Sequence, residues 1–235
     1  MRNILILALL LAGTAGARAE FEEVRELTLG TAGVSRLEID AGAGNLVVTG
    51  LANENQVRVR ATIQVRGNEE KARRRMEEKM NLSLERDGEV ARLTARFEQE
   101  YWSIGKGPTI HLDIAMPASL GLAIDDGTGS ILVRDVRGDV VVEDGTGSIK
   151  LEGVGGNVEI KDGTGEITVS DVGGDLVIED GTGGIDVVGV GGSVTVDDGT
   201  GHIDVADVGR DLLIGESGTG GVAYRNVKGS IGGRF

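Results

Sequence analysis

The sequence predicts an all-β protein: a right-handed parallel β-solenoid (β-helix) with 18-residue coils and a small helix-containing insertion near its N-terminus. The first observation is a repeat, because the motif DGTG occurs five times at intervals of 18 residues. Its copies begin at Asp126, Asp144, Asp162, Asp180 and Asp198, and a sixth copy, SGTG, begins at Ser217 after 19 residues. The second observation is that each repeat divides into two nine-residue halves of the form D-x-x-G-x-[IVL]-x-[IVL]-x.

Apolar residues alternate with other residues inside every half. The sixth position is aliphatic in all twelve halves, from Ile131 to Ile231. Alternation over four or five residues predicts a strand with one buried face. The glycine at the fourth position is expected to supply a positive φ or a close backbone approach in a tight turn. The aspartate at the first position is expected to accept hydrogen bonds from N–H groups of that turn.

An antiparallel meander is the alternative arrangement, because Asp-Gly between short strands is also a hairpin signal. The strict period argues against a meander, since identical residues at fixed intervals stack on one another only in a solenoid. Parallel crossovers are almost always right-handed, which predicts the hand of the coil. Six coils at about 4.8 Å each would form a rod about 29 Å long.

Composition and charge limit the partners. The chain has 235 residues with 40 Gly, 2 Pro, no Cys and 3% aromatic residues, which suits a core too thin for large rings. Residues 121–235 carry 8 basic and 21 acidic side chains, whereas residues 20–120 carry 14 and 17. The acidity therefore belongs to the repeats, and it argues against nucleic acid and anionic membranes as partners.

Residues 1–19 are predicted to be a signal peptide. Arg2 supplies the basic start, residues 4–12 the apolar run, and Ala17-Arg18-Ala19 the small-residue cleavage site before Glu20. The apolar run is too short to span a bilayer, and no later stretch predicts a transmembrane segment. We therefore expect an exported protein of the periplasm, the cell envelope or the extracellular space.

Residues 20–120 are expected to form an irregular β-rich part that precedes the regular solenoid of residues 121–235. Residues 37–48 are a degenerate repeat, with Gly42 and Gly44 where later copies have Gly-Thr-Gly. Residues 56–66 alternate as a strand, residues 81–98 read as a hairpin around an Asp-Gly turn, and residues 109–116 form a strand that ends at a proline. A helix is predicted near residues 68–80, with Asn68 as its N-cap. The helix and hairpin would be an excursion that caps the open end of the rod.

Several of these features occur together in a known family. They are the leader, the irregular β-rich start, the strand 111–117 that ends in proline, and many copies of G-x-I-x-V-x-x-V-x-G-x-V-x-I. With them, residues 37–235 resemble the bacterial "putative adhesin" family, a domain of unknown function built of β-strand repeats. The resemblance implies a β-solenoid on an exported or cell-envelope protein, and it brings no catalytic residues with it. This chain differs in being unusually regular and in having no visible anchor.

The first-position aspartates are the sharpest chemical feature of the repeats. Five carboxylates at coil spacing would repel one another unless cations or N–H groups compensate them, so Asp126, Asp144, Asp162, Asp180 and Asp198 are candidate ligand-binding residues. A calcium-binding β-roll is one interpretation, because it also uses nine-residue repeats. Its calcium-binding aspartate is at position 6, which is aliphatic here, so turn capping is favoured. We expect no cofactor and no specific metal site, and only weak, non-specific binding of divalent cations.

Other chemical signals are sparse. Tyr101 and Trp102 are adjacent aromatic residues in a polar stretch of an aromatic-poor chain, and they are candidates for contact with a partner or sugar. His111 and His202 are isolated, and the many carboxylate pairs follow from the repeat rather than interrupting it. The sequence shows no recognisable combination of catalytic residues.

The sequence therefore favours a non-enzymatic, exported cell-envelope protein. Its solenoid would act as a scaffold or as an adhesin-like binding module for an envelope protein or polysaccharide. Two alternatives stay open: a polysaccharide-active β-helix enzyme and a calcium-binding protein similar to a β-roll.

Overall fold

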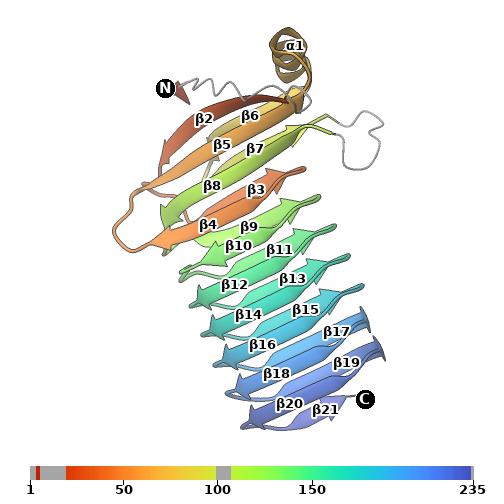
Figure 1. Cartoon of the computed structure of the whole chain (residues 1–235). Helices are drawn as coiled ribbons and strands as arrows, with labels where there is room; N and C mark the ends of the chain where they lie inside the picture. The colour runs from red at the N-terminus through yellow and green to blue at the C-terminus, as the bar shows by residue number, and fades with distance from the viewer. Residues whose placement is uncertain (1–3, 6–19, 99–106, 234–235) are drawn as a thin grey trace.

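The computed structural model describes residues 4–5, 20–98 and 107–233, and these form two long sheets that face each other across a narrow core (Figure 1). The 11-stranded sheet has the order β1-β2-β5-β8-β4-β10-β12-β14-β16-β18-β20, and the 10-stranded sheet has the order β21-β19-β17-β15-β13-β11-β9-β3-β7-β6. The predicted leader lies outside the described residues except for β1 (Ile4–Leu5), which pairs antiparallel with β2 (Glu20–Gly30).

The repeats form a parallel β-solenoid, as the 18-residue period predicts. Each coil gives one strand to each sheet. The strands of the 10-stranded sheet are β9 (Gly121–Asp126), β11 (Val140–Asp144), β13 (Val158–Asp162), β15 (Leu176–Asp180), β17 (Val194–Thr200), β19 (Leu212–Thr219) and β21 (Ile231–Gly233). Those of the 11-stranded sheet are β10 (Ile131–Arg134), β12 (Ile149–Val154), β14 (Ile167–Val172), β16 (Ile185–Val190), β18 (Ile203–Val208) and β20 (Val222–Val227).

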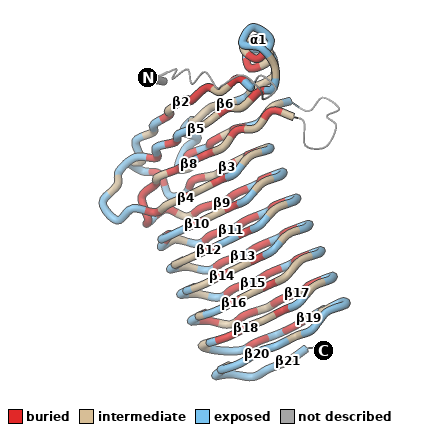
Figure 2. The backbone as a smooth tube through the Cα atoms, in the orientation of Figure 1, coloured by how far each residue is buried: buried red, intermediate tan, exposed pale blue. Residues whose placement is uncertain are grey.

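The register places identical positions of successive coils on top of one another. Ile167 pairs with Ile149 on one side and with Ile185 on the other, and its side chain is fully buried. Burial alternates along the strands of the rod as far as the start of β19, as the red and pale segments of Figure 2 show. The 19-residue step before Ser217 is accommodated by a shift of register between β17 and β19 after Val196. The core is thus a stack of aliphatic side chains, and its burial stabilises the rod.

The rod begins before the regular repeats. β3 (Arg36–Ala41) pairs in parallel with β9, and β4 (Leu46–Leu51) pairs in parallel with β10. An isolated bridge joins Ala43 to Thr128, so the predicted degenerate repeat is confirmed as the first coil.

An excursion follows this first coil and returns to it. It consists of β5 (Gln56–Arg66), α1 (Glu69–Lys79), β6 (Met80–Asp87), β7 (Val90–Phe97) and β8 (Thr109–Pro117). β8 returns beside β4 in parallel, β5 adds antiparallel to β8, and β7 adds in parallel to β3. β6 and β7 form the predicted hairpin, and the Oδ1 of Asn68 accepts a hydrogen bond from the N–H of Lys71 at 3.0 Å, which confirms the N-cap. Among the described residues, no helix is both long and apolar enough to cross a membrane.

The fourth-position glycines are required mainly by close approach of the backbones. A Cβ built on Gly165 would lie 1.5 Å from the carbonyl oxygen of Gly147, and one built on Gly183 would lie 1.4 Å from that of Gly165. Gly129 and Gly147 also have positive φ, so of the two expected reasons for glycine, close approach is the one that recurs along the column. The glycine column is conserved within the chain because each turn rests directly on the turn before it.

Candidate functional site

The DGTG edge of the rod holds the five candidate aspartates in one column. Successive members pair in register, from Asp126 with Asp144 to Asp180 with Asp198. All five are buried, with exposed fractions between 2% and 8%. Strand parity explains the burial, because Asp126 follows Leu122 and Ile124 at steps of two and so points to the same inner side. The D-x-x-G pattern predicted a turn at these residues and not their burial, although the alternation of the preceding strand indicates it.

The turn satisfies these carboxylates only in part. The N–H of Thr146 donates to Oδ1 of Asp144 at 3.3 Å, and the N–H of Thr200 donates to Oδ1 of Asp198 at 3.0 Å, so the predicted capping is confirmed in these two turns. At least one oxygen of each aspartate in the column is nevertheless buried without a hydrogen-bond partner. A buried oxygen without a partner is costly, and the cost is larger when the carboxylate is charged.

Burial raises the pKa of every member of the column. Loss of hydration is the largest cause, and it acts with the neighbouring carboxylate of Asp144 to raise the pKa of Asp126 to about 7. Burial and the next carboxylate in the column raise the pKa values of Asp144 and Asp180 to about 6. Burial also raises the pKa values of Asp162 and Asp198, and at Asp198 the hydrogen bond from the N–H of Thr200 opposes the rise. The column therefore carries protons at a pH where ordinary carboxylates are charged.

An acidic hollow of about 770 Å³ runs beside this column. Its lining includes four of the buried aspartates together with Glu143, Lys161, Glu179, Asp197 and Glu216. The structure brings the acidic side chains of five successive coils together here, from Glu143 and Asp144 on β11 to Glu216 on β19. In the described part of the chain, no group of three or more His, Cys, Asp or Glu side chains is arranged to hold a metal ion.

The opposite edge of the rod is built differently, because the first residue of each second half takes a left-handed backbone conformation. Asp135, Asp171 and Asp207 have φ values of 57°, 58° and 59°, and the intervening Gly153 and Gly189 have 72° and 78°. The left-handed residue breaks the strand alternation. The aspartate is turned out to solvent, and the following valine is turned into the core, as Val136 is. Aspartate and glycine are among the residues that tolerate this conformation.

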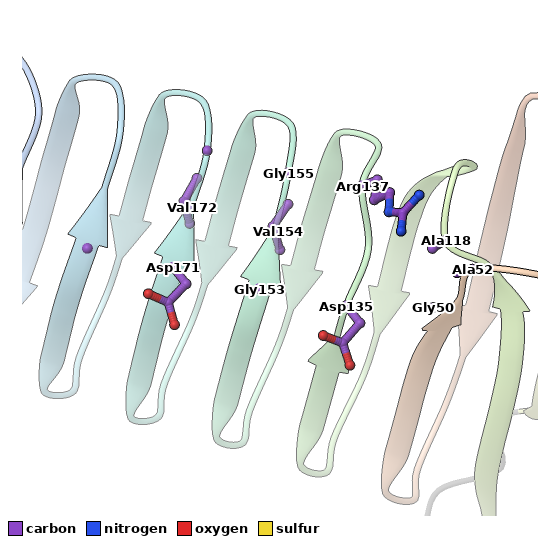
Figure 3. Close-up of a pocket in the computed structure, with 12 residues that line it drawn as sticks. Gly50, Ala52, Ala118, Asp135, Arg137, Gly153, Val154, Gly155, Asp171 and Val172 are labelled. Carbon is purple, nitrogen blue, oxygen red and sulfur yellow. The ribbon is translucent and has the colours of Figure 1, made fainter.

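Aspartate and glycine alternate in this column from Asp135 to Asp207, and the carboxylates of Asp135 and Asp171 lie close to the glycine of the next coil. A Cβ on Gly153 would lie 3.4 Å from Oδ1 of Asp135, and a Cβ on Gly189 would lie 3.2 Å from Oδ1 of Asp171. Figure 3 shows the carboxylates of Asp135 and Asp171 on the same side of the rod, with Gly153 in the coil between them. These aspartates were not among the predicted site residues. The signal was their recurrence at every second coil.

A long groove follows this edge. One hollow of about 700 Å³ is lined by Gly50, Ala52, Ala118, Asp135, Arg137, Gly153, Val154, Gly155, Asp171, Val172, Gly173 and Gly189. A second of about 360 Å³ shares Gly189 and continues past Asp207 to Asn226 and Lys228. We call the two together the glycine groove. It extends from the first coil to the last, and its floor consists largely of backbone and glycine.

Many of the remaining acidic residues have a structural role that the sequence did not reveal. Oδ1 of Asp139 accepts a hydrogen bond from the N–H of Asn157 at 2.8 Å, and Oδ1 of Asn157 accepts one from the N–H of Asp175 at 2.9 Å. The ladder continues from Asp175 to the N–H of Ser193 at 2.8 Å. These side chains bind backbone N–H groups at the ends of the strands, so they are not free to bind a ligand with that oxygen.

The other candidates contribute less. Tyr101 and Trp102 lie outside the described residues. Nδ1 of His111 accepts a hydrogen bond from the N–H of Asn45 at 3.0 Å, which gives this histidine a structural role. His202 is exposed, and its Nε2 lies 3.8 Å from Oδ1 of Asp186. The two histidines occupy different parts of the rod and form no common site.

Comparisons with known proteins identify solved structures only. No family model and no curated protein matches the chain. A "putative cell adhesion protein" from Clostridium sporogenes ATCC 15579 is 14% identical, with a TM-score of 0.38, and the match covers 92% of this chain and 99% of that one. A "putative adhesin" from Parabacteroides distasonis ATCC 8503 is 14% identical, with a TM-score of 0.39 and coverage of 90% and 97%. A "putative lipid binding protein" from the same organism is 13% identical, with a TM-score of 0.43 and coverage of 90% and 94%.

Identity and superposition are too low to transfer a ligand or a partner. The solenoid assignment depends on the strand registers described above.

Proposed function

We propose that this chain is a non-enzymatic, exported cell-envelope module whose rod presents the glycine groove to a linear polysaccharide. The observation that carries the proposal is the continuity of the groove, which follows one edge of the rod from Gly50 to Lys228. A groove that is long, open and repetitive fits a ligand that is itself long and repetitive. The sequence pattern of residues 1–19, which predicts a signal peptide, supports export.

The chemistry of the groove fits an uncharged or amino-substituted glycan. Asp135, Asp171 and Asp207 recur at every second coil, which places their carboxylates about 10 Å apart along the edge. Ionised carboxylates only accept hydrogen bonds, and sugar hydroxyl and amino groups can donate them. The glycines between them allow a flat chain to approach the backbone closely. The acidity of the rod disfavours anionic polymers.

Binding without hydrolysis is favoured by the regularity of the groove. Glycoside hydrolysis needs two carboxylates in different environments on either side of one bond. The aspartates of the groove are equivalent to one another and are separated by whole coils. A polysaccharide-active enzyme stays the alternative, and its mark would be shortening of the bound polymer.

The test is sedimentation of the full exported chain with insoluble envelope polysaccharide. The test variant changes Asp135, Asp171 and Asp207 together to glycine, the residue that the chain itself uses in the same conformation at Gly153 and Gly189. The matched control removes three charges from other parts of the rod with Glu143→Gln, Glu159→Gln and Glu179→Gln. We expect the glycine variant to lose at least about tenfold in affinity, or about 1.4 kcal/mol, and the control to keep its affinity.

Three results would contradict the proposal. One is equal binding by the parent and the glycine variant, which would place the ligand elsewhere. A second is the absence of binding to any envelope polysaccharide. The third is release of shorter sugars from the polymer, which would establish the enzyme instead.

A further inference from the structure

The two ends of the rod differ in how their terminal strands and core are covered. At the N-terminal end, β2 and β6 belong to different sheets and contact each other, and the helix α1 buries Ala72 and Met76 (Figure 1). At the C-terminal end, β20 and β21 are the last strands of the two sheets, and within the described residues each pairs on one side only. An edge strand of this kind presents a row of N–H and C=O groups that can pair with another strand.

Core positions become exposed at this end. Ile231 stacks on Leu212 and is 41% exposed, although Leu212 is only 1% exposed. Tyr224 stacks on Val205 and is 45% exposed, whereas Val205 is fully buried. Val222 is only partly buried, and Figure 2 shows the last coil pale where the coils before it are red. Within residues 20–98 and 107–233, the apolar interior of the rod thus reaches the surface between two strand edges that each pair on one side only.

The charge of the last coil also differs from that of the rod. Residues 217–233 contain Arg225 and Lys228 and no acidic residue, and serine replaces the aspartate of the motif at Ser217. Every earlier coil carries an excess of carboxylates. The end surface therefore lacks the dense negative charge that would keep two rods apart.

We propose that the C-terminal end binds a second copy of this chain end to end, in a twofold-symmetric dimer. The end presents two strand edges on either side of one apolar core, and a single extended peptide could pair with only one of them. The same end of a second copy presents the same two edges at the same separation. A twofold axis perpendicular to the sheets would pair β20 with β20 and β21 with β21 antiparallel, so both sheets would continue from one rod into the other. Twofold interfaces of this kind are the commonest in soluble oligomers.

The N-terminal end does not offer the same match. Its strands include antiparallel additions, and its core is covered by α1 and by the contact of β2 with β6. Head-to-tail stacking would produce filaments, and the covered end opposes them. The inference is independent of the ligand proposed for the groove, which lies along the side of the rod.

The first experiment measures molar mass by light scattering over a concentration series, with circular dichroism as a check of folding. We expect the parent chain to form a dimer. Ile231→Lys places a charge on the end surface and should weaken the dimer at least about tenfold, or about 1.4 kcal/mol. Val177→Lys is the matched control, because Val177 is 37% exposed on the side of the rod, and it should leave the dimer unchanged.

The second experiment uses the absence of cysteine from the chain. Ala223→Cys places a single thiol on β20, and Arg74→Cys places one on α1 at the other end. A short bismaleimide should cross-link two Ala223→Cys chains and leave Arg74→Cys chains uncoupled. A monomeric parent chain, a dimer unaffected by Ile231→Lys, or cross-linking of the Arg74→Cys chain would each overturn the proposal. Capture of a foreign strand by a monomeric rod would overturn it as well.

Discussion

At the scale of single residues, the same amino acid has opposite roles on the two edges of the rod. Asp144 continues its strand and points inward, whereas Asp135 takes a left-handed conformation and points outward. Both occupy the first position of a D-x-x-G half, so the motif alone does not distinguish them. The distinction comes from one backbone angle, which decides whether the aspartate or the next residue enters the core.

The inward column makes the stability of the rod depend on pH. The folded pKa values of Asp126, at about 7, and of Asp144 and Asp180, at about 6, lie above the ordinary value of 3.8. The folded state therefore binds more protons than the unfolded state between these values, and stability is lost as the pH rises through them. We expect the melting temperature to be higher at pH 5 than at pH 8, by about 2–4 °C for each kcal/mol of difference. A thermal melting series from pH 4 to pH 8 measures this.

A substitution that makes one buried aspartate neutral tests whether the column is the source of this pH dependence of stability. Asp162→Asn should raise the melting temperature at pH 8, because it removes a buried charge, and the rise should become smaller as the pH is lowered, because burial raises the pKa of this carboxyl. The exposed Glu166→Gln is the control and should change neither value. An equal loss of stability at both pH values in Asp162→Asn would show that the carboxylate is required in its charged form.

At the scale of the strand and its turn, the aliphatic positions supply the stability. Ile167→Asp would place a charge with no partner in a dry core and should lower the free energy of unfolding by several kcal/mol. Val141→Asp is the matched control, since Val141 is 36% exposed on the outer face of β11. Urea unfolding of both variants measures the difference. Equal midpoints for the two would show that the inward assignment is wrong.

The turns should be equally intolerant of a single methyl group. Gly165→Ala would place Cβ 1.5 Å from the carbonyl oxygen of Gly147, so two coils must separate, and we expect a loss of about 3 kcal/mol or more. Gly221→Ala is the control, because nothing lies within 4 Å of its Cβ position. Denaturant unfolding should leave the control within about 1 kcal/mol of the parent. A small loss in the free energy of unfolding of Gly165→Ala would contradict the prediction, because it would mean that two coils can separate at little cost.

The strands and turns of the rod could be predicted from the sequence, because a period of 18 residues determines which residues stack in successive coils. The strands, the register of Ile149, Ile167 and Ile185, the N-cap at Asn68 and the first coil at residues 37–48 all follow from local patterns. The order of the N-terminal strands does not follow, because nothing local indicates that β8 returns beside β4. The glycine groove is also not evident, since it depends on left-handed aspartates whose φ the motif does not specify.

At the scale of the whole molecule, the rod combines an aliphatic core with a strongly acidic surface. The chain has a net charge of −14, and residues 121–235 hold most of the excess. Self-repulsion of this charge opposes the compact state, and salt screens it within about 10 Å at 0.1 M. Any cation should therefore stabilise the rod to a modest extent.

The final prediction separates such screening from a structural requirement for calcium. Aliphatic residues occupy the sixth position of every half, and those from Ile131 to Leu212 are buried, so the coil closes on its own core. The buried aspartates lower their charge by taking up protons, which provides a route to stability without metal. We expect a β-rich circular dichroism spectrum in excess EDTA. Calcium should raise the melting temperature only slightly, and sodium chloride at matched ionic strength should have a similar effect. A disordered spectrum in EDTA that becomes β-rich on addition of calcium would instead assign the Asp126–Asp198 column as metal ligands.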